Sequence, residues 1–167
     1  MEEKITVQMT ADNLFDFLLF HTYSKFAGFL TNILGLAIAF MGIIMLATGR
    51  ASVLRFLFYL AAAALFLLYT PVSLKLRANK QMKVNPEFSN PKEYTFGEEG
   101  ICVVQNQKEA VYAWEQIEKV VATPKNIGIY YGVNDALIIP KQEFGEKFMS
   151  VMKVITAHVS RERVKIR

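Results

Sequence analysis

Few side chains in this chain of 167 residues have the types and spacing that catalysis needs. Its two histidines, His21 and His158, lie in different segments without HExxH or a Cys/His cluster, so neither a zinc site nor a histidine relay is expected. The one cysteine, Cys102, excludes an internal disulfide and any CxxC pair. Glu98 and Glu99 are adjacent carboxylates, but a solvated strand end explains both. Because GxSxG, GxxxxGK[ST] and GxGxxG are also absent, we expect a non-enzymatic protein with no catalytic residue, metal or cofactor.

Two long apolar runs dominate the first half of the chain instead. Residues 26–48 and 56–74 contain no Asp, Glu, Lys, Arg or His, and basic residues flank both runs. A helix of about 20 apolar residues crosses a hydrocarbon core of about 30 Å. The runs therefore predict a two-span hairpin over residues 26–74, embedded in the lipid bilayer. Without ionisable side chains, these spans offer no relay for protons or ions.

The formal net charge is +4, and the placement of the basic residues says more than their sum. A lysine or arginine near an anionic membrane surface is worth about 1 kcal/mol, so basic residues beside a span favour lipid contact over nucleic acid. More basic residues lie outside the two runs than in the turn between them, so both termini are expected in the cytoplasm. The predicted anionic-lipid contact consists of Lys75, Arg77, Lys80 and Lys83.

Small residues recur along both runs and predict how the spans pack. In the first run glycines are spaced by seven, which keeps them on one side of a helix. Small residues let two helices approach closely within lipid. We expect an intramolecular seam with Gly42 and Ala62 at the same depth; a homodimer face, or the general frequency of glycine in membrane helices, are the alternatives. The seam residues are Gly28, Gly35, Gly42, Ala61 and Ala62.

The segments around the hairpin are shorter and more mixed in composition. Residues 5–9 alternate as a strand does, and residues 11–24 favour an apolar helix that we place at the membrane interface, with a core helix of a soluble domain as the alternative. Residues 82–92 contain Pro86, Asn90 and Pro91, which predicts a linker or an irregular connection.

The pattern of the C-terminal half predicts a meander of short strands followed by one helix. Apolar residues from Phe144 to Val159 recur at helical spacing, which predicts one face packed on the sheet. We expect Trp114 to fill the core rather than to stand exposed as an anchor, and Phe144 to make the first core contact of the helix. The basic tail after residue 160 is expected to be solvated, with lipid contact as the alternative. The expected strands are 94–97, 101–105, 110–114, 117–122, 127–131 and 136–139.

Three segments carry a resemblance to a known family. The runs Tyr94-Thr-Phe-Gly-Glu-Glu-Gly-Ile101, Trp114-Glu-Gln-Ile-Glu-Lys-Val120 and Ala136-Leu-Ile-Ile-Pro-Lys-Gln-Glu-Phe144 are similar to the YcxB-like family of bacterial membrane proteins. The resemblance implies two spans before a cytoplasmic domain of pleckstrin-homology (PH) type, in which an antiparallel sheet or partly open barrel is closed by a C-terminal helix. It implies no established activity. Because a hairpin returns both of its ends to one side, the N-terminal strand is expected to join this sheet.

These observations divide the chain into an N-terminal strand and helix (residues 1–25), the hairpin (26–74), a basic connection (75–92) and a PH-like domain (93–167). We expect a membrane-anchored binding or regulatory module that recognises a protein segment or anionic lipid headgroups at the inner face of the cytoplasmic membrane. A small accessory or structural subunit of a larger membrane complex is the alternative. A homo-oligomer is compatible with both, and nucleic acid with neither.

Overall fold

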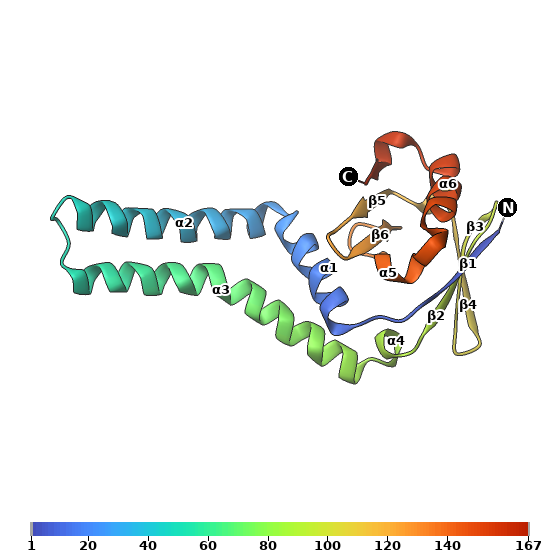
Figure 1. Cartoon of the computed structure of the whole chain (residues 1–167), viewed down its shortest axis with the longest axis horizontal. Helices are drawn as coiled ribbons and strands as arrows, with labels where there is room; N and C mark the ends of the chain where they lie inside the picture. Colours follow the sequence, from blue (N-terminus) through green and yellow to red (C-terminus); the bar gives the residue numbers. More distant parts are fainter. Residues whose placement is uncertain (1, 167) are drawn as a thin grey trace. The chain divides into compact units, whose positions relative to one another are not determined.

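A computed structural model describes residues 2–166 of the chain (Figure 1). The chain divides into two compact units. One combines Met1–Phe17 with Ala78–Arg167, and the other is Leu18–Arg77. We call the first the sheet unit and the second the hairpin unit. The hairpin unit is thus an insertion in the sequence of the sheet unit.

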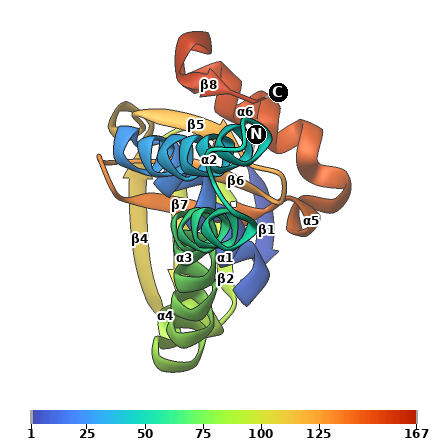
Figure 2. The same ribbon diagram turned by 90° about the vertical axis from the view of Figure 1, so that its left-hand side faces the viewer.

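Two long helices make up most of the hairpin unit. Helix α2 is Phe26–Ala47, and helix α3 begins at Val53 and continues to Val84, past the end of this unit. The turn between them contains Gly49 with φ +70°, a backbone conformation that glycine adopts without strain. Figure 2 shows α2 and α3 end on, lying side by side.

Both helices are long and apolar enough to cross a membrane. Only 11% of the most apolar window of α2 and 6% of that of α3 is buried within the structure. Apolar helices in the core of a soluble protein would be mostly buried. The apolar surface of α2 and α3 is instead mostly uncovered by other described residues.

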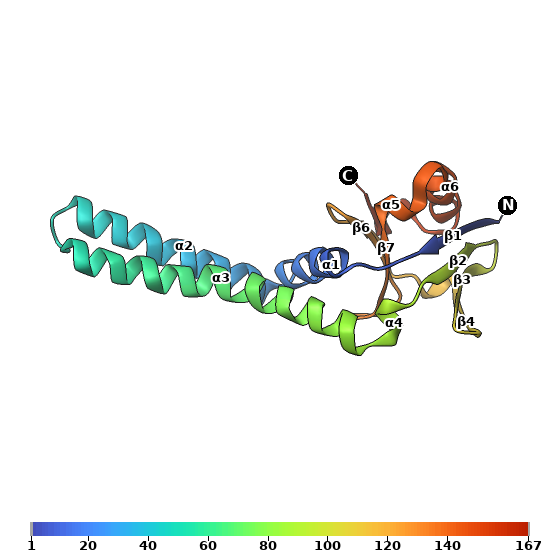
Figure 3. The same ribbon diagram turned by 60° about the horizontal axis from the view of Figure 1, so that its bottom comes forward.

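The first sheet of the sheet unit is an antiparallel meander with the order β1-β2-β3-β4. The expected N-terminal strand joins it next to the strand that begins at Lys92 (Figure 3). Ile5 lies opposite Tyr94, and Val7 lies opposite Lys92. This confirms the predicted addition of the N-terminal strand, which the hairpin separates in sequence from its partner. The strands are β1 (Glu3–Val7), β2 (Lys92–Phe96), β3 (Gly100–Gln105) and β4 (Lys108–Ala113).

The second sheet has the order β7-β6-β5-β8. Its last strand pairs Val164 in parallel with Val120, and Arg163 Nη1 donates to the carbonyl of Ile117 at 3.3 Å. The tail is thus ordered by backbone pairing, while its basic residues Arg161, Arg163 and Lys165 are exposed, as expected. Within residues 2–166 no strand pairing closes the two sheets into a barrel. The strands are β5 (Lys119–Ala122), β6 (Asn126–Tyr130), β7 (Ala136–Pro140) and β8 (Val164–Lys165).

The predicted C-terminal helix is present but interrupted. Helix α5 (Lys141–Phe144) ends at Gly145, whose φ of +51° stops the helix, and α6 (Phe148–His158) follows a short 3-10 turn. The buried face of α6 contains Val151 and Ile155, as the spacing predicts.

One hydrophobic core joins both sheets and α6. Phe144 is buried in it and meets Phe148 edge to face, with ring centroids 5.6 Å apart. Trp114 is only 5% exposed, so its predicted core position is confirmed. Its ring stacks on His158 at 5.0 Å, and its Nε1 donates to the carbonyl of Gly97 at 3.0 Å.

One expectation about the connecting segments is wrong, and for another the structure supports the alternative in part. The connection at residues 82–92 is largely helical, because α3 continues to Val84 and α4 (Pro86–Ser89) starts behind Asn85, whose side chain accepts from the Glu87 N–H at 3.1 Å. Helix α1 (Ala11–Tyr23) was placed at the membrane interface, yet Leu14 and Phe17 in its first half are buried in the sheet unit. The core-helix alternative therefore holds for that half.

Candidate binding site

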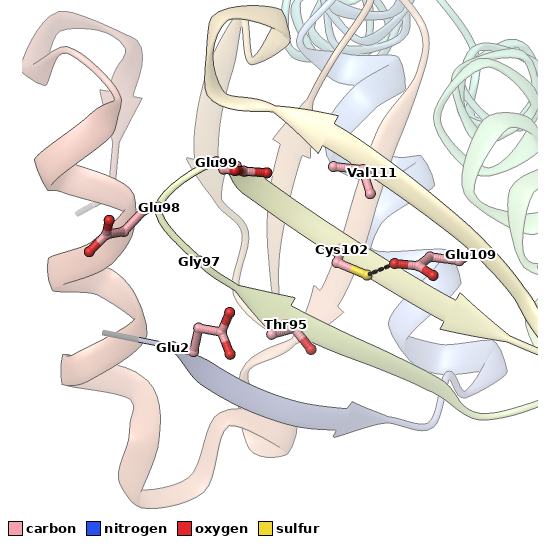
Figure 4. A pocket seen from close by; sticks show the side chains of 9 residues that line it. Glu2, Thr95, Gly97, Glu98, Glu99, Cys102, Glu109 and Val111 are labelled. Carbon is pink, nitrogen blue, oxygen red and sulfur yellow. Dashed lines mark hydrogen bonds between the residues drawn. The ribbon is translucent and has the colours of Figure 1, made fainter.

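An open cavity of about 500 Å³ lies on the outer face of β2, β3 and β4, the face turned away from the core (Figure 4). Strand alternation places Thr95, Cys102 and Val111 in one row across this face, because they are register partners. Their neighbours in sequence, such as Phe96 and Ile101, point into the core instead. The floor of the cavity is therefore built from short side chains.

The rim of the cavity is acidic. Glu98 and Glu99 form the turn between β2 and β3, Glu109 lies on β4, and Glu2 precedes β1 (Figure 4). Four carboxylates around a small cavity favour a cationic group and oppose an anionic one. Within residues 2–166, no three His, Cys, Asp or Glu side chains are grouped closely enough to hold a metal ion.

Trp114 fixes the turn that carries two of these carboxylates. Its indole N–H donates to the carbonyl of Gly97, and the Gly97 N–H donates to the carbonyl of Gly100 at 3.0 Å. A Cβ at Gly100 would collide with the carbonyl oxygen of Tyr112, so a glycine is needed for the close approach of β3 and β4 at this point. The buried core thus positions an exposed acidic turn.

Cys102 is held as a neutral thiol. Its Sγ donates to Glu109 Oε1 at 3.1 Å. Burial and this neighbouring carboxylate both raise the pKa of the Cys102 thiol above its ordinary value, because each disfavours the thiolate. The thiolate is the nucleophilic form, so Cys102 is poorly suited to covalent chemistry near neutral pH.

Strand β4 is an open edge beside the cavity, since its only partner among the described strands is β3. The turn between them has two residues, Asn106 and Gln107, with φ of +50° and +64°, and closes at the pair of Gln105 and Lys108. Such a turn closes on a hydrogen-bonded pair, and bonded and non-bonded pairs then alternate along the ladder.

That alternation fixes which backbone groups of β4 face outward. Glu109 and Val111 belong to the non-bonded pairs, so their N–H and C=O groups point away from β3. Ala113, at the next outward position, donates its N–H to Gln116 Oε1 at 3.2 Å and not to β3, as the alternation requires. The side chain of Val111 is 59% exposed. The cavity therefore borders a strand edge with backbone donors and acceptors in position for another strand.

A second polar cluster joins the start of α1 to the turn between β5 and β6. Asp16 Oδ2 accepts from the Thr123 hydroxyl, from Asn126 Nδ2 at 2.8 Å and from the Lys125 N–H at 3.3 Å. Asn126 Nδ2 also donates to the carbonyl of Asn13 at 2.9 Å. We call these five residues the α1 latch.

Apolar packing reinforces the α1 latch. A Cβ at Gly128 would lie 2.6 Å from Cε2 of Phe17, so the glycine leaves room for this ring on β6. The same ring lies 5.8 Å from that of Tyr130. The residues immediately before the hairpin are thus fixed to the sheet unit by both hydrogen bonds and packing.

The predicted lipid-contact residues all lie on α3. Lys75, Arg77, Lys80 and Lys83 are exposed and occupy the part of the helix beyond the second apolar run. They fan over about half of the helix circumference rather than forming a narrow stripe, because the helix turns about 100° per residue. Their contact with lipid stays a prediction.

The glycines of the predicted seam have different surroundings. Gly35 and Gly42 are the buried residues of α2, and a Cβ at Gly42 would lie 2.6 Å from Cβ of Tyr59 on α3. At Gly35 the added Cβ would lie 2.8 Å from Leu67. Gly28 faces the carbonyl of Thr22 and serves the junction between α1 and α2.

On α3 the side chains opposite the glycines are large. Gly42 meets Tyr59 and Phe56, about one helical turn nearer to the connecting turn than Ala62. Ala61 is exposed, Ala62 is half-buried and Ala63 is buried, so the small residue that packs inward is one further along than those named from the sequence.

Sequence reasoning found the lining of the cavity only in part. Glu98, Glu99 and Cys102 were singled out, but as a solvated strand end and a lone thiol. Their grouping with Glu2 depends on β1 pairing across the inserted hairpin, a contact between distant parts of the sequence. The α1 latch was missed because Asp16 and Asn126 are separated by 110 residues and form no recognised motif.

The comparisons with known proteins cover one part of the chain. A family model described as YcxB-like protein matches residues 96–149, which run from the end of β2 to the start of α6. The resemblance is thereby confirmed for this segment. No curated protein and no solved structure matches the chain significantly.

Proposed function

We propose that this chain, YcxB-like over residues 96–149, is a membrane-anchored module that binds a protein segment on the outer face of β2–β4. The main support is the insertion of the hairpin between β1 and β2. Both ends of the apolar hairpin return to one folded unit, which β1–β2 pairing and the α1 latch hold together. In this proposal α2 and α3 cross the cytoplasmic membrane, and both termini are cytoplasmic.

The sheet unit is proposed to be of PH-like type. A four-stranded meander, a second meander of three strands and a C-terminal helix follow one another, in the order that such a domain has. The hairpin then occupies the connection between the first two strands. This arrangement anchors a binding domain without adding a terminal linker.

The chemistry of the cavity favours a protein ligand over a lipid headgroup. Its carboxylates Glu2, Glu98, Glu99 and Glu109 would repel an anionic headgroup. The neighbouring edge of β4 offers backbone donors and acceptors at alternate residues, a pattern that the backbone of an extended peptide matches.

We assign a separate role to the basic end of α3. Lys75, Arg77, Lys80 and Lys83 are proposed to lie at the anionic surface of the inner leaflet and to orient the sheet unit there. Reversing these four charges should weaken the association of the chain with anionic lipid in mixed nanodiscs. Unchanged lipid preference would contradict this assignment.

A site-specific photo-cross-linker tests the proposed binding function in cells. Placed at Val111 beside the cavity, it should give a discrete protein adduct that is lost when Glu98 and Glu99 are changed to Lys. Placed at Val133, which is 80% exposed in the turn after β6, it should not. Adducts to phospholipid alone, or equal adducts at both positions, would refute the proposed protein site.

An accessory subunit of a larger membrane complex is the second candidate. The observation that favours it is the apolar outer surface of the hairpin, where Phe40 is 67% and Phe58 is 68% exposed. This role predicts stoichiometric protein cross-links from Phe40 or Phe58 and none from Val111.

A further inference from the structure

We infer that the free edge of β4 accepts an extended segment of a partner protein in which Lys or Arg alternates with apolar residues, added to the first sheet as a fifth strand. This inference rests on the proposed function, because it specifies the segment that the outer face of β2–β4 binds. Three observations carry it: the outward backbone groups of β4, the exposed apolar surface at Val111 and the excess of carboxylates around the cavity.

The backbone of β4 provides the affinity. Glu109 and Val111 each direct one N–H and one C=O outward, so an added strand gains hydrogen bonds at alternate residues. Main-chain pairing of this kind recognises an extended segment irrespective of its sequence.

The outer face provides the selectivity. Side chains of an added strand alternate between the two faces of the sheet, so every second one projects on the side of the cavity. A long Lys or Arg side chain can lay its apolar stem over Val111 and bring its charge toward Glu109 and the acidic turn. Lys4, which lies opposite Thr95 on the same face, is already engaged in an ion pair with Glu93 at 2.6 Å. A cationic segment is therefore complementary, and an acidic one is repelled.

The same charges disfavour a second copy of the chain as the occupant. Antiparallel pairing of β4 with β4 would add a second acidic cavity and supply no cationic side chain to the carboxylates of the first. The segment is accordingly assigned to another protein.

The test uses the full chain in nanodiscs of zwitterionic lipid, which do not attract the peptide by themselves. The probe is a short fluorescent peptide in which Lys and Val alternate. Two control peptides carry Glu in place of Lys, or the same Lys–Val sequence with N-methylated backbone amides on the pairing edge. We expect both control peptides to bind at least about tenfold more weakly than the probe, measured by fluorescence anisotropy.

Two variants with the same change of charge locate the site. Glu98→Lys with Glu99→Lys should weaken probe binding about tenfold, whereas Glu115→Lys with Glu118→Lys, on exposed residues outside the cavity, should change it less than about twofold. A third variant, Val111→Pro, removes one outward N–H without touching the ladder to β3. It should weaken binding more than Val111→Thr, which changes the same side chain but keeps that N–H.

Several results would overturn the inference. Equal binding of the Lys and Glu peptides would exclude charge selection, and full binding of the methylated peptide would exclude strand addition. Dimerisation through β4, or competition of anionic vesicles for this face, would assign it to another occupant. If Val111 nevertheless gives the protein adduct in cells, the proposed function stands and only the basic-strand inference fails.

Discussion

The side chain of Asn126 contacts both α1 residues of the latch, so its removal should weaken the latch. Its side chain is fully buried, and its Nδ2 donates to the carbonyl of Asn13 at 2.9 Å and to the carboxylate of Asp16 at 2.8 Å. A neutral hydrogen bond contributes about 0.5–1.5 kcal/mol, and one to a charged group about 1.5–3 kcal/mol. Asn126→Ala removes both.

Part of that loss is offset within the same site. Oδ1 of Asn126 is buried without a hydrogen-bond partner among the described residues, and the alanine variant removes this unfavourable group. We therefore expect the free energy of unfolding of the sheet unit to fall by about 2 kcal/mol. With a urea dependence of about 2 kcal/mol per molar, the unfolding midpoint should fall by about 1 M.

Trp114 provides the assay for this change. It is the one tryptophan of the chain and lies in the core of the sheet unit, so its fluorescence reports the unfolding of that unit while detergent shields the apolar helices. Asn79→Ala, at an exposed site on α3, is the matched control. A shift for Asn126→Ala no larger than that of the control would refute the latch.

Three further predictions concern other parts of the molecule. Gly42→Leu should overpack the contact with Tyr59 and weaken the pairing of α2 with α3 by about 1–3 kcal/mol. The yield of a disulfide between cysteines placed at positions 39 and 63 should therefore fall. Glu109→Gln should lower the raised pKa of Cys102 and speed its alkylation by iodoacetamide about two- to fivefold at mildly alkaline pH. Burial raises the pKa of Tyr131 to about 12 in the folded chain. The stability contributed by the neutral Tyr131 side chain is therefore present below about pH 10 and is lost as the pH rises toward about 12. The urea midpoint should fall over that range.

Matched variants make these predictions specific. Ala37→Leu, at an exposed position of α2, should leave the disulfide yield unchanged, and Glu115→Gln should leave the alkylation rate unchanged. For the alkaline titration, Tyr131→Phe should reduce the fall in the midpoint above about pH 10. An undiminished fall in that variant would assign the pH dependence to other groups.

Strand positions could be predicted where one face is buried. Residues 101–105 were predicted as a strand and β3 is Gly100–Gln105, because Ile101 and Val103 alternate with residues on the outer face. On β4 the prediction began two residues late. Lys108 and Glu109 are exposed on an edge strand, where neither burial nor intrinsic preference marks the start of the strand.

The remaining errors come from contacts between distant parts of the sequence. Strand β8 is only two residues long, and its parallel pairing with β5 depends on α6 returning the chain to that edge. The apolar residues of α1 gave no indication of what they would pack against, because the partners of Phe17 are Gly128 and Tyr130. The candidate site has the same origin, since Glu2 lies beside the cavity only because β1 pairs with β2 on the far side of the inserted hairpin in the sequence.

In the proposed topology the hairpin crosses the membrane twice and returns both of its ends to one cytoplasmic domain. Single cysteines at Ser52, in the turn after α2, and at Val133, in the sheet unit, test this in a Cys102→Ser background with a membrane-impermeant maleimide. We predict that position 52 is labelled in intact spheroplasts and position 133 only in inside-out vesicles. Labelling of position 133 in intact spheroplasts would contradict this topology. It would also be contradicted if, without detergent, neither position were labelled in spheroplasts and both were labelled in inside-out vesicles.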